Sequence, residues 1–349
     1  MKTILNTHLQ NYPQIQAQDV IKLCFQNEFG CEHMISTQEK SLQHILDEST
    51  SLSKKEIKIE SIGNHLVRFH FGQLSSLEAY TLNQLFILTA NTCKGNKESF
   101  IQKLKECQEE LNDETITQYI NNYLKQGIKP ISHSSAYHDA YEPHYRILRE
   151  DLAYAFPLFL KINKLKKSKD HLLIAIDGKC GSGKTTLALL LNEIYQGNVF
   201  HMDDFFLQPY QRTSSRLEKP GENVDHERFL KEVLEPLSFK QNVLYQPFDC
   251  SKMALSNEIE TILNKPINII EGTYSLHPNL IDYYDLKIAL TIDDHLQMKR
   301  IVRRNGSQMA EKFRDLWIPL ENRYFNELHI FYKADVCCET SKNHVEILP

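Results

Sequence analysis

The 349-residue sequence lacks the features that mark several protein classes. Its eight cysteines are scattered and include no C-x-x-C pair, so neither a disulfide framework nor a structural zinc site is expected. No apolar run approaches the roughly 18 residues that cross a bilayer, and the first residues hold too short an apolar stretch for a secretory signal. We therefore expect a cytoplasmic location and no membrane partner.

Strong charge of one sign is also lacking. The net charge is −5 at pH 7 and no long basic stripe occurs, which argues against a broad nucleic-acid-binding surface. Internal repeats and low-complexity tracts are absent as well. What remains is the composition of an ordinary globular protein, 41% hydrophobic and 24% charged, at a length that suggests two domains.

The N-terminal part reads as a mainly helical domain over residues 1–160. Helices are predicted over residues 17–29, 37–48, 75–89, 97–111 and 113–126, and one strand over residues 65–71. Residues 161–170 are basic and polar and are expected to form a linker, or alternatively a solvated helix end, and a second domain is expected over residues 171–349.

Two patches of the N-terminal domain, residues 27–33 and 132–146, are rich in histidine, cysteine, tyrosine and acids. A metal or ligand site could draw on five of their side chains: Cys31, His33, His133, His138 and His144. Their spacing matches no metal template. In a second interpretation, Tyr137, Tyr141 and Tyr145 form one helical face at a domain interface, since they are four residues apart.

The second domain opens on a strand, a glycine-rich loop and a helix. Residues 172–176 are apolar and predict a strand buried on both faces. Residues 178–185 fit G-x-x-x-x-G-K-[ST] at every fixed position, and an apolar helix follows. Glycines let the backbone amides surround a phosphate, and the helix N-terminus adds positive potential. The stretch predicts binding of a nucleoside triphosphate.

Seven residues of this stretch are the predicted nucleotide contacts: Gly178, Gly181, Ser182, Gly183, Lys184, Thr185 and Thr186. Lys184 would reach the β- and γ-phosphates, and the Thr185 hydroxyl would ligate Mg²⁺. ATP and Mg²⁺ are therefore the expected cofactors.

Two further strands are predicted to deliver acids beside the loop. Residues 198–202 run into Asp203 and Asp204, and residues 267–270 run into Glu271. Asp203 could accept or orient the proton of an attacking hydroxyl and help to hold Mg²⁺. Alternatively, the two aspartates cap a helix. Glu271 follows the mostly apolar residues 267–270, as the acid of a Walker-B motif does. It would bind Mg²⁺ directly or contact one of the ligands of Mg²⁺.

A cationic helix follows the fourth strand, which is predicted over residues 286–292. Residues 297–306 carry four cations: Lys299, Arg300, Arg303 and Arg304. Phosphoryl transfer spreads negative charge over the γ-phosphate oxygens, which a closing arginine lid can neutralise while it excludes water. The alternative is a solvated helix face.

Together these segments carry a resemblance to a known family. Residues 178–185, 201–206, 223–226, 245–249, 271–275 and 297–306 make residues 171–340 similar to the uridine kinase family of P-loop kinases. The wider group includes nicotinamide riboside kinase and phosphoribulokinase. The resemblance implies an α/β P-loop kinase fold, with a parallel sheet flanked by helices.

The resemblance also implies roles for individual residues. Asp203 would be the base, and Asp225 would hold ribose hydroxyls, with His226 beside it. Phe248 and Asp249 would lie near the wall that binds the nucleobase. The implied reaction is ATP-dependent phosphorylation of a nucleoside such as uridine or cytidine to its 5′-monophosphate, on a primary hydroxyl activated by Asp203.

Other functions fit the same residues. One is a P-loop kinase for a sugar, a vitamin or another riboside. A different class is an ATP-binding regulatory protein that signals to the N-terminal domain. In the kinase interpretations the partner is a small-molecule phosphate acceptor, and self-association into a homo-oligomer is compatible with the sequence.

Overall fold

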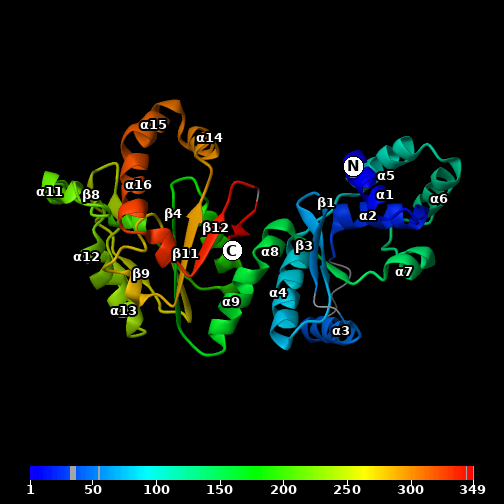
Figure 1. The fold of residues 1–349 in the computed structure, drawn as a ribbon, viewed down its shortest axis with the longest axis horizontal. Coiled ribbons are helices and arrows are strands. Elements are labelled where there is room, and N and C mark those ends of the chain that lie inside the picture. Colours follow the sequence, from blue (N-terminus) through cyan, green and yellow to red (C-terminus); the bar gives the residue numbers. More distant parts are fainter. Residues whose placement is uncertain (32–36, 54–55, 343, 349) are drawn as a thin grey trace. The chain divides into compact units, whose positions relative to one another are not determined.

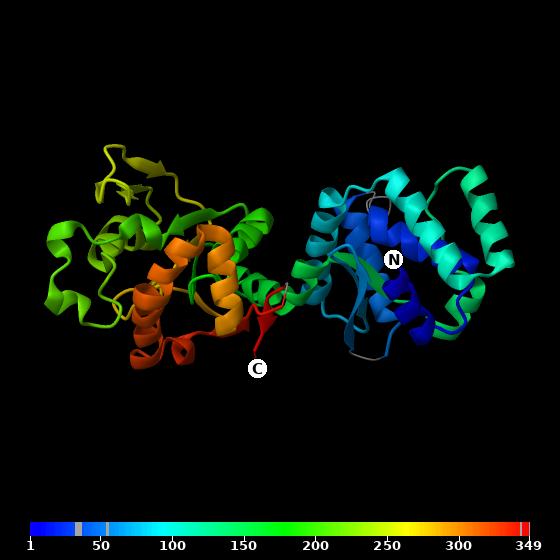
Figure 2. The same cartoon turned by 90° about the horizontal axis from the view of Figure 1, so that it is seen from above.

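A computed structural model describes residues 1–31, 37–53, 56–342 and 344–348, and it divides into two compact units. Unit 1 is Met1–Phe156 and unit 2 is Pro157–Pro349 (Figures 1 and 2). The predicted linker at 161–170 is therefore wrong for most of its length. Helix α9 (Phe156–Lys166) runs through it, because Leu158, Phe159 and Ile162 form a buried apolar face.

Unit 1 combines helices with a small antiparallel sheet. Its sheet has the order β1 (Ile57–Gly63), β2 (Leu66–Phe71) and β3 (Tyr145–Arg149). The helices are α1 (Lys2–Asn11), α2 (Ala17–Phe29), α3 (Gln38–Thr50), α4 (Ser76–Thr92), α5 (Lys97–Leu111), α6 (Glu114–Lys125), α7 (Ser135–Tyr141) and α8 (Glu150–Tyr154). The five predicted helices and the predicted strand are all present; β1 and β3 are additional.

One prediction for this unit is wrong. Tyr137 and Tyr141 lie on α7, but Tyr145 lies on strand β3, so the three do not form one helical face. Helix α7 stops because Glu142 takes a left-handed conformation with φ of 40° and Pro143, which cannot continue a helix, comes next.

Unit 2 is built on a six-stranded sheet with the order β13-β12-β11-β4-β10-β5. The parallel strands are β4 (Leu172–Gly178), β5 (Asn198–His201), β10 (Ile267–Glu271), β11 (Leu286–Thr291) and β12 (Val336–Glu339); β13 (Glu346–Ile347) is antiparallel at one edge. Helices flank this sheet (Figure 1), and the predicted α/β fold is confirmed. Every residue of β4 and β10 is buried, as expected for central parallel strands.

The helices of unit 2 fall into two groups along the chain. Before the β10 strand lie α9, α10 (Lys184–Tyr195), α11 (Ser214–Leu217), α12 (His226–Phe229) and α13 (Glu235–Ser238), with the short helices η2 (Met202–Phe205), η3 (Pro209–Gln211) and η4 (Leu230–Leu234). After it lie η5 (Ile281–Tyr283), α14 (Asp294–Asn305), α15 (Ser307–Lys312), η6 (Phe313–Trp317), α16 (Ile318–Glu327) and α17 (Ile330–Lys333).

A long excursion between β5 and β10 carries two small hairpins, β6 (Val243–Tyr245) with β9 (Glu260–Ile262) and β7 (Phe248–Asp249) with β8 (Ala254–Leu255). Its inner side chains, among them Phe205, Phe229 and Tyr245, join the buried apolar cluster of unit 2. This excursion therefore lies at the end of β5, next to the predicted chemistry. Among the described residues, no helix is both long enough and apolar enough to cross a membrane.

The register of the central strands aligns their carboxyl ends. Glu271 at the end of β10 pairs with Ile176 of β4 on one side and with His201 of β5 on the other. The turn after β4 must be tight, and Gly178 makes it possible. A Cβ at this position would lie 2.3 Å from the Leu290 carbonyl oxygen, and the φ of 148° disfavours any other residue.

Candidate active site

The glycine-rich loop lies between β4 and α10 in the predicted arrangement. Gly181 and Gly183 have φ angles of 73° and 94°, which glycine adopts without strain. The amide of Ser182 donates to the Lys179 carbonyl at 3.1 Å and closes the turn. Lys184 begins helix α10, so Thr185 and Thr186 stand in its first turn. The loop and the helix N-terminus together form a phosphate cradle.

The ammonium group of Lys184 is bound to the protein itself. It donates to the Gly178 carbonyl at 2.8 Å, to the Lys179 carbonyl at 3.2 Å and to the Thr273 hydroxyl at 3.0 Å. Thr273 follows β10, so the lysine connects the loop to the neighbouring strand. A phosphate that binds Lys184 must replace some of these acceptors.

Three side chains meet where the loop, β10 and β5 end. They are Thr185 after the loop, Glu271 at the end of β10 and His201 at the end of β5. The Thr185 hydroxyl donates to Glu271 Oε1 at 3.0 Å, and His201 Nδ1 lies 2.6 Å from the same oxygen. Glu271 is buried. The hydrogen bond to Glu271 raises the pKa of His201, whereas burial opposes this shift. No role for His201 was predicted, although its position just before Asp203 could have suggested one.

Asp203 follows His201 by two positions in the chain, and it is exposed to solvent. The surrounding protein removes part of its hydration and raises the pKa of Asp203 above its ordinary value. Lys184 lowers this pKa, while the carboxylates of Glu271 and Asp204 raise it further. The result is an accessible carboxylate with a stronger affinity for a proton than an ordinary aspartate.

Asp204 has a different environment. Its Oδ2 accepts a hydrogen bond from the Tyr245 hydroxyl at 2.9 Å, and its carbonyl accepts one from Arg228 at 2.7 Å. The Arg228 guanidinium also stacks over the Phe205 ring at 4.1 Å. Asp204 is thus tied into the excursion, and Asp203 is the aspartate of the pair that remains accessible.

Asp225 and His226 are both buried and bonded within the chain. Asp225 caps α12 by accepting from the Arg228 amide at 3.1 Å, and its other oxygen accepts from Gln211 at 2.8 Å. The His226 ring stacks on His277 at 4.0 Å, and its Nε2 lies 3.2 Å from Glu222. Substrate contacts by either residue require an exchange of these partners.

Glu222, His226 and His277 are the one group of potential metal ligands that converges in the described residues. Hydrogen bonds within the chain explain why these three side chains lie close together. The Asn279 amide donates to His277 Nδ1 at 3.2 Å, which leaves the proton on Nε2, the nitrogen that faces Glu222. Burial lowers the pKa of His277 to about 3, so its ring is neutral and its Nε2–H is directed toward Glu222.

Phe248 and Asp249 lie on the short β7 strand. Phe248 is buried, and its ring packs edge-on against Phe206 at 6.2 Å. Asp249 accepts hydrogen bonds from the amide and the hydroxyl of Ser251 at 2.9 and 2.6 Å, which lowers the pKa of Asp249. The aspartate therefore holds a local turn, and the aromatic pair forms an apolar wall.

The three predicted lid arginines on α14 lie in different environments. Arg300 donates to the Gly181 carbonyl at 3.2 Å and to the Thr340 carbonyl at 2.6 Å, so it holds the outside of the loop and is not free to close over a ligand. Its place on the inner face of the helix explains this. Arg303 and Arg304 are exposed in the last turn of α14, where Arg304 contacts the neighbouring Asn305.

Two buried acids next to the loop were not predicted. Asp177, the penultimate residue of β4, accepts hydrogen bonds from the Gly178, Tyr274 and Leu276 amides and from the Tyr324 hydroxyl. Burial outweighs these donors and raises the pKa of Asp177 to about 6. A carboxylate inside a strand buried on both faces requires such donors, which was the available signal.

The second acid is Glu321 on α16. Its Oε2 accepts from the Cys180 amide of the loop at 2.9 Å, and its Oε1 accepts from the Thr273 hydroxyl at 3.3 Å. Burial raises the pKa of Glu321, and the nearby Lys184 charge opposes that shift. Nothing in the local sequence pattern marks this residue, because its partners lie more than 40 positions away.

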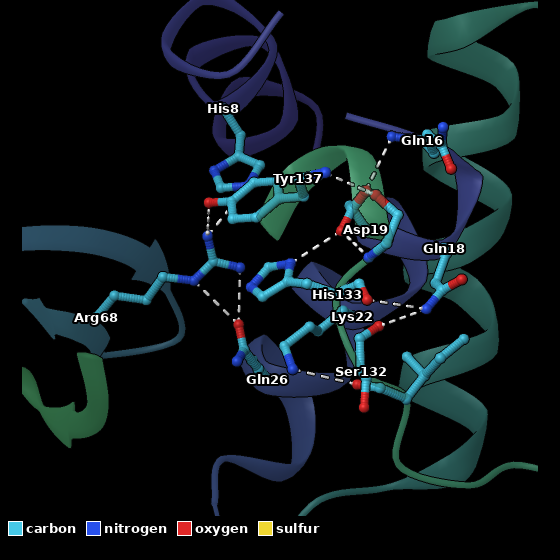
Figure 3. Close-up of polar contacts among 12 residues, drawn as sticks. His8, Gln16, Gln18, Asp19, Lys22, Gln26, Arg68, Ser132, His133 and Tyr137 are labelled. Atoms are coloured by element: carbon cyan, nitrogen blue, oxygen red, sulfur yellow. Dashed lines mark hydrogen bonds and ion pairs between the residues drawn. The ribbon is translucent and has the colours of Figure 1, made fainter. Parts of the chain in front are cut away.

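Side chains of the second histidine-rich patch, among them His133 and Tyr137, belong to a buried polar network (Figure 3). His133 Nδ1 lies 2.9 Å from Asp19, and its Nε2 lies 2.6 Å from the Tyr145 hydroxyl. Arg68, fully buried, donates twice to the Gln26 side-chain oxygen at 3.0 and 2.8 Å. These contacts are those of a satisfied core.

The predicted alternative of a metal site in unit 1 is not formed by the described residues. Cys31 donates to the Ile147 carbonyl, His144 binds Glu48 at 2.9 Å, and His138 is exposed. His33 lies outside the described residues.

Comparisons with known proteins find sequence relatives over about half of the chain. No protein-family model matches the chain. The uridine kinase of Anoxybacillus flavithermus is 27% identical over 200 residues, which cover 52% of this chain and 86% of that protein. Uridine-cytidine kinase D of Dictyostelium discoideum is 25% identical over 192 residues, which cover 53% of this chain and 37% of that protein. Among solved structures, a possible uridine kinase from Bacillus stearothermophilus matches 52% of this chain and 98% of its own, with 21% identity and a TM-score of 0.38.

Unit 2 is thus an α/β unit with a mostly parallel sheet and a glycine-rich P-loop between β4 and α10. The predicted resemblance to the uridine kinase family is confirmed over about half of the chain.

Proposed function

We propose that this protein is an ATP-dependent kinase that phosphorylates a hydroxyl group of a small molecule, a nucleoside of the uridine or cytidine kind, to the 5′-monophosphate. One observation carries the proposal. Adjacent strands and the loop bring Thr185, Glu271 and the accessible Asp203 to one edge of the sheet, as phosphoryl transfer requires. The similarity to uridine kinases supports the acceptor class.

In this proposal the triphosphate lies on the loop amides and the N-terminus of α10. Lys184 exchanges the carbonyls of Gly178 and Lys179 for phosphate oxygens. Thr185 and Glu271 offer a hydroxyl and a carboxylate oxygen 3.0 Å apart, a hard donor set that fits Mg²⁺. When bound, Mg²⁺ neutralises negative charge on the phosphates.

Asp203 accepts the proton of the attacking hydroxyl. It is accessible, and its raised pKa makes it a better base than an ordinary aspartate. Arg303 and Arg304, exposed at the end of α14, supply positive charge to the transferring phosphoryl group. A nucleoside would pack against the wall of Phe206 and Phe248.

A second candidate is a kinase for a sugar, a vitamin or another riboside. It is favoured by the state of Asp225, whose two oxygens are already bonded to Gln211 and to the Arg228 amide. An acceptor without a ribose diol would leave these bonds in place.

The test is ADP release from MgATP by the full chain against a panel of nucleosides, ribosides, sugars and vitamins. Turnover with uridine or cytidine supports the first proposal, and turnover with another acceptor supports the second. ATP binding without any turnover would favour a regulatory protein that signals to unit 1. A cytoplasmic location and self-association stay predictions from the sequence.

A further inference from the structure

A buried carboxylate, Glu321, occupies the outer rim of the phosphate loop. It lies on α16, more than 130 residues beyond the loop, and its Oε2 accepts the Cys180 amide at 2.9 Å. Amide groups of such a loop are the donors that bind phosphate oxygens. The Glu321 carboxylate is therefore an anion of the chain itself that is bound at the edge of the proposed phosphate site.

The Glu321 carboxylate is also connected to Lys184 through the Thr273 hydroxyl. The Thr273 hydroxyl, which has one proton, lies 3.3 Å from Glu321 Oε1 and 3.1 Å from the Gly178 carbonyl, and its oxygen accepts a hydrogen bond from Lys184 Nζ at 3.0 Å. The Lys184 charge also attracts Glu321 directly. With the carbonyls of Gly178 and Lys179, these groups hold the ammonium back against the loop.

We propose that Glu321 is a positioning residue that holds Lys184 and the Cys180 amide in a resting arrangement, and that the terminal phosphates of a nucleoside triphosphate displace it from both. This inference rests on the proposed function, because it needs a nucleotide on the loop. Glu321 competes with the nucleotide as one anion against another for the same donors. Its removal therefore favours the nucleotide-bound arrangement.

The competition is local because other contacts fix the loop independently of Glu321. Gln297 donates to the Cys180 carbonyl at 2.9 Å, and Arg300 donates to the Gly181 carbonyl. Both come from α14, and the Cys180 side chain packs with Ile301 and Phe313. The loop keeps these supports when Glu321 leaves.

The decisive variant is Glu321→Gln, which keeps the shape and one acceptor oxygen but removes the charge. Calorimetric titration with Mg²⁺ and a non-hydrolysable ATP analogue should show about tenfold tighter binding than in the wild-type protein, since a competing anion is gone. A merely structural role predicts the opposite, because loss of a buried contact weakens the loop. Unchanged or weaker binding overturns the proposal.

The matched control is Glu327→Gln on the same helix. Glu327 is exposed and pairs with Arg323 at 3.1 Å, so its neutralisation should leave nucleotide affinity unchanged. An equal gain of affinity in this variant would assign the effect to net charge and overturn the role of Glu321.

A measurement on the wild-type protein keeps the inference testable even if the Glu321 variant does not fold. Hydrogen exchange of residues 318–327 should increase when the analogue binds, because Glu321 loses its partners on the loop, while exchange of the loop decreases. No change in residues 318–327 overturns the proposal. If neither the wild-type protein nor the variant binds the analogue, the proposed function fails and the inference falls with it. If the wild-type protein binds and the variant binds no better, this inference alone fails.

Discussion

The hydroxyl of Thr185 donates a hydrogen bond to Glu271 at 3.0 Å, although the two residues are 86 positions apart in the chain. The contact exists because Thr185 stands in the first turn of the helix after β4 and Glu271 ends the adjacent strand β10. It brings together the two oxygen donors on which the proposed reaction depends. The predictions below test the residues around this contact.

Asp203→Asn should lower turnover by roughly 10²–10⁴ and leave ATP binding near normal, because one general base is lost while the phosphate cradle is intact. Steady-state kinetics and a binding titration check this. Asp204→Asn is the matched control. Its carboxylate accepts the Tyr245 hydroxyl, so its loss should affect stability more than turnover. Unchanged turnover in Asp203→Asn would remove this residue from the mechanism.

Two arginines of α14 should behave differently. Arg303→Ala should lower turnover about tenfold or more, with little change in the free energy of unfolding, because the side chain is exposed. Arg300→Ala should lower the free energy of unfolding by about 1–3 kcal/mol, because the Gly181 and Thr340 carbonyls lose a charged donor. Urea unfolding and kinetics on both variants separate the roles; the reverse pattern would make Arg300 the lid residue.

The buried carboxyl of Asp177 should make stability depend on pH. Its pKa rises from 3.8 to about 6 on folding, so the folded protein binds the proton more tightly. The stabilising contribution is therefore full below pH 3.8 and is lost as the pH rises through 6. The free energy of unfolding lost in Asp177→Asn should be about 1 kcal/mol larger at pH 5 than at pH 7. A difference that is constant between these pH values would show that Asp177 does not titrate there.

Arg68→Met should destabilise unit 1 by about 3–5 kcal/mol, because it leaves the buried Glu60 and Gln26 oxygens without their cationic partner. Urea unfolding followed by circular dichroism measures this loss. The control Lys2→Met removes an exposed cation 3.6 Å from Glu110 and should cost under about 1 kcal/mol.

If the two compact units fold independently, nucleotide binding should be unchanged in Arg68→Met. Loss of nucleotide binding in this variant would instead show that unit 2 depends on unit 1.

The parts of the site that could be predicted are those marked by residues close together in the sequence. The loop at 178–185 is contiguous, and Thr185 near Glu271 follows from the parallel alignment of strand ends. The contacts of Glu321 with Cys180 and of Asp177 with Tyr324 could not be predicted, since only the packing of α16 brings these residues together. In unit 1, β3 was missed because its five residues, YRILR, carry no clear alternation.

The placement of Arg300 shows the same limit. Composition identified a cationic helix, but only the packed structure shows that Arg300 lies on the face turned toward the loop while Arg303 lies on the outer face. Helical spacing distributes neighbouring arginines around the helix, so residues of one motif can have unrelated roles.

The register of β10 has a consequence for how the proposed kinase could diversify. A shift of one residue would turn Glu271 to the opposite face of the sheet and separate it from Thr185. Residues 206–262 of the excursion, which follow Asp203 and Asp204, form no strand of the central sheet. Substitutions and insertions there can change which alcohol is accepted while the phosphate chemistry stays in place. The fold thus separates a part that tolerates sequence drift from a part that does not.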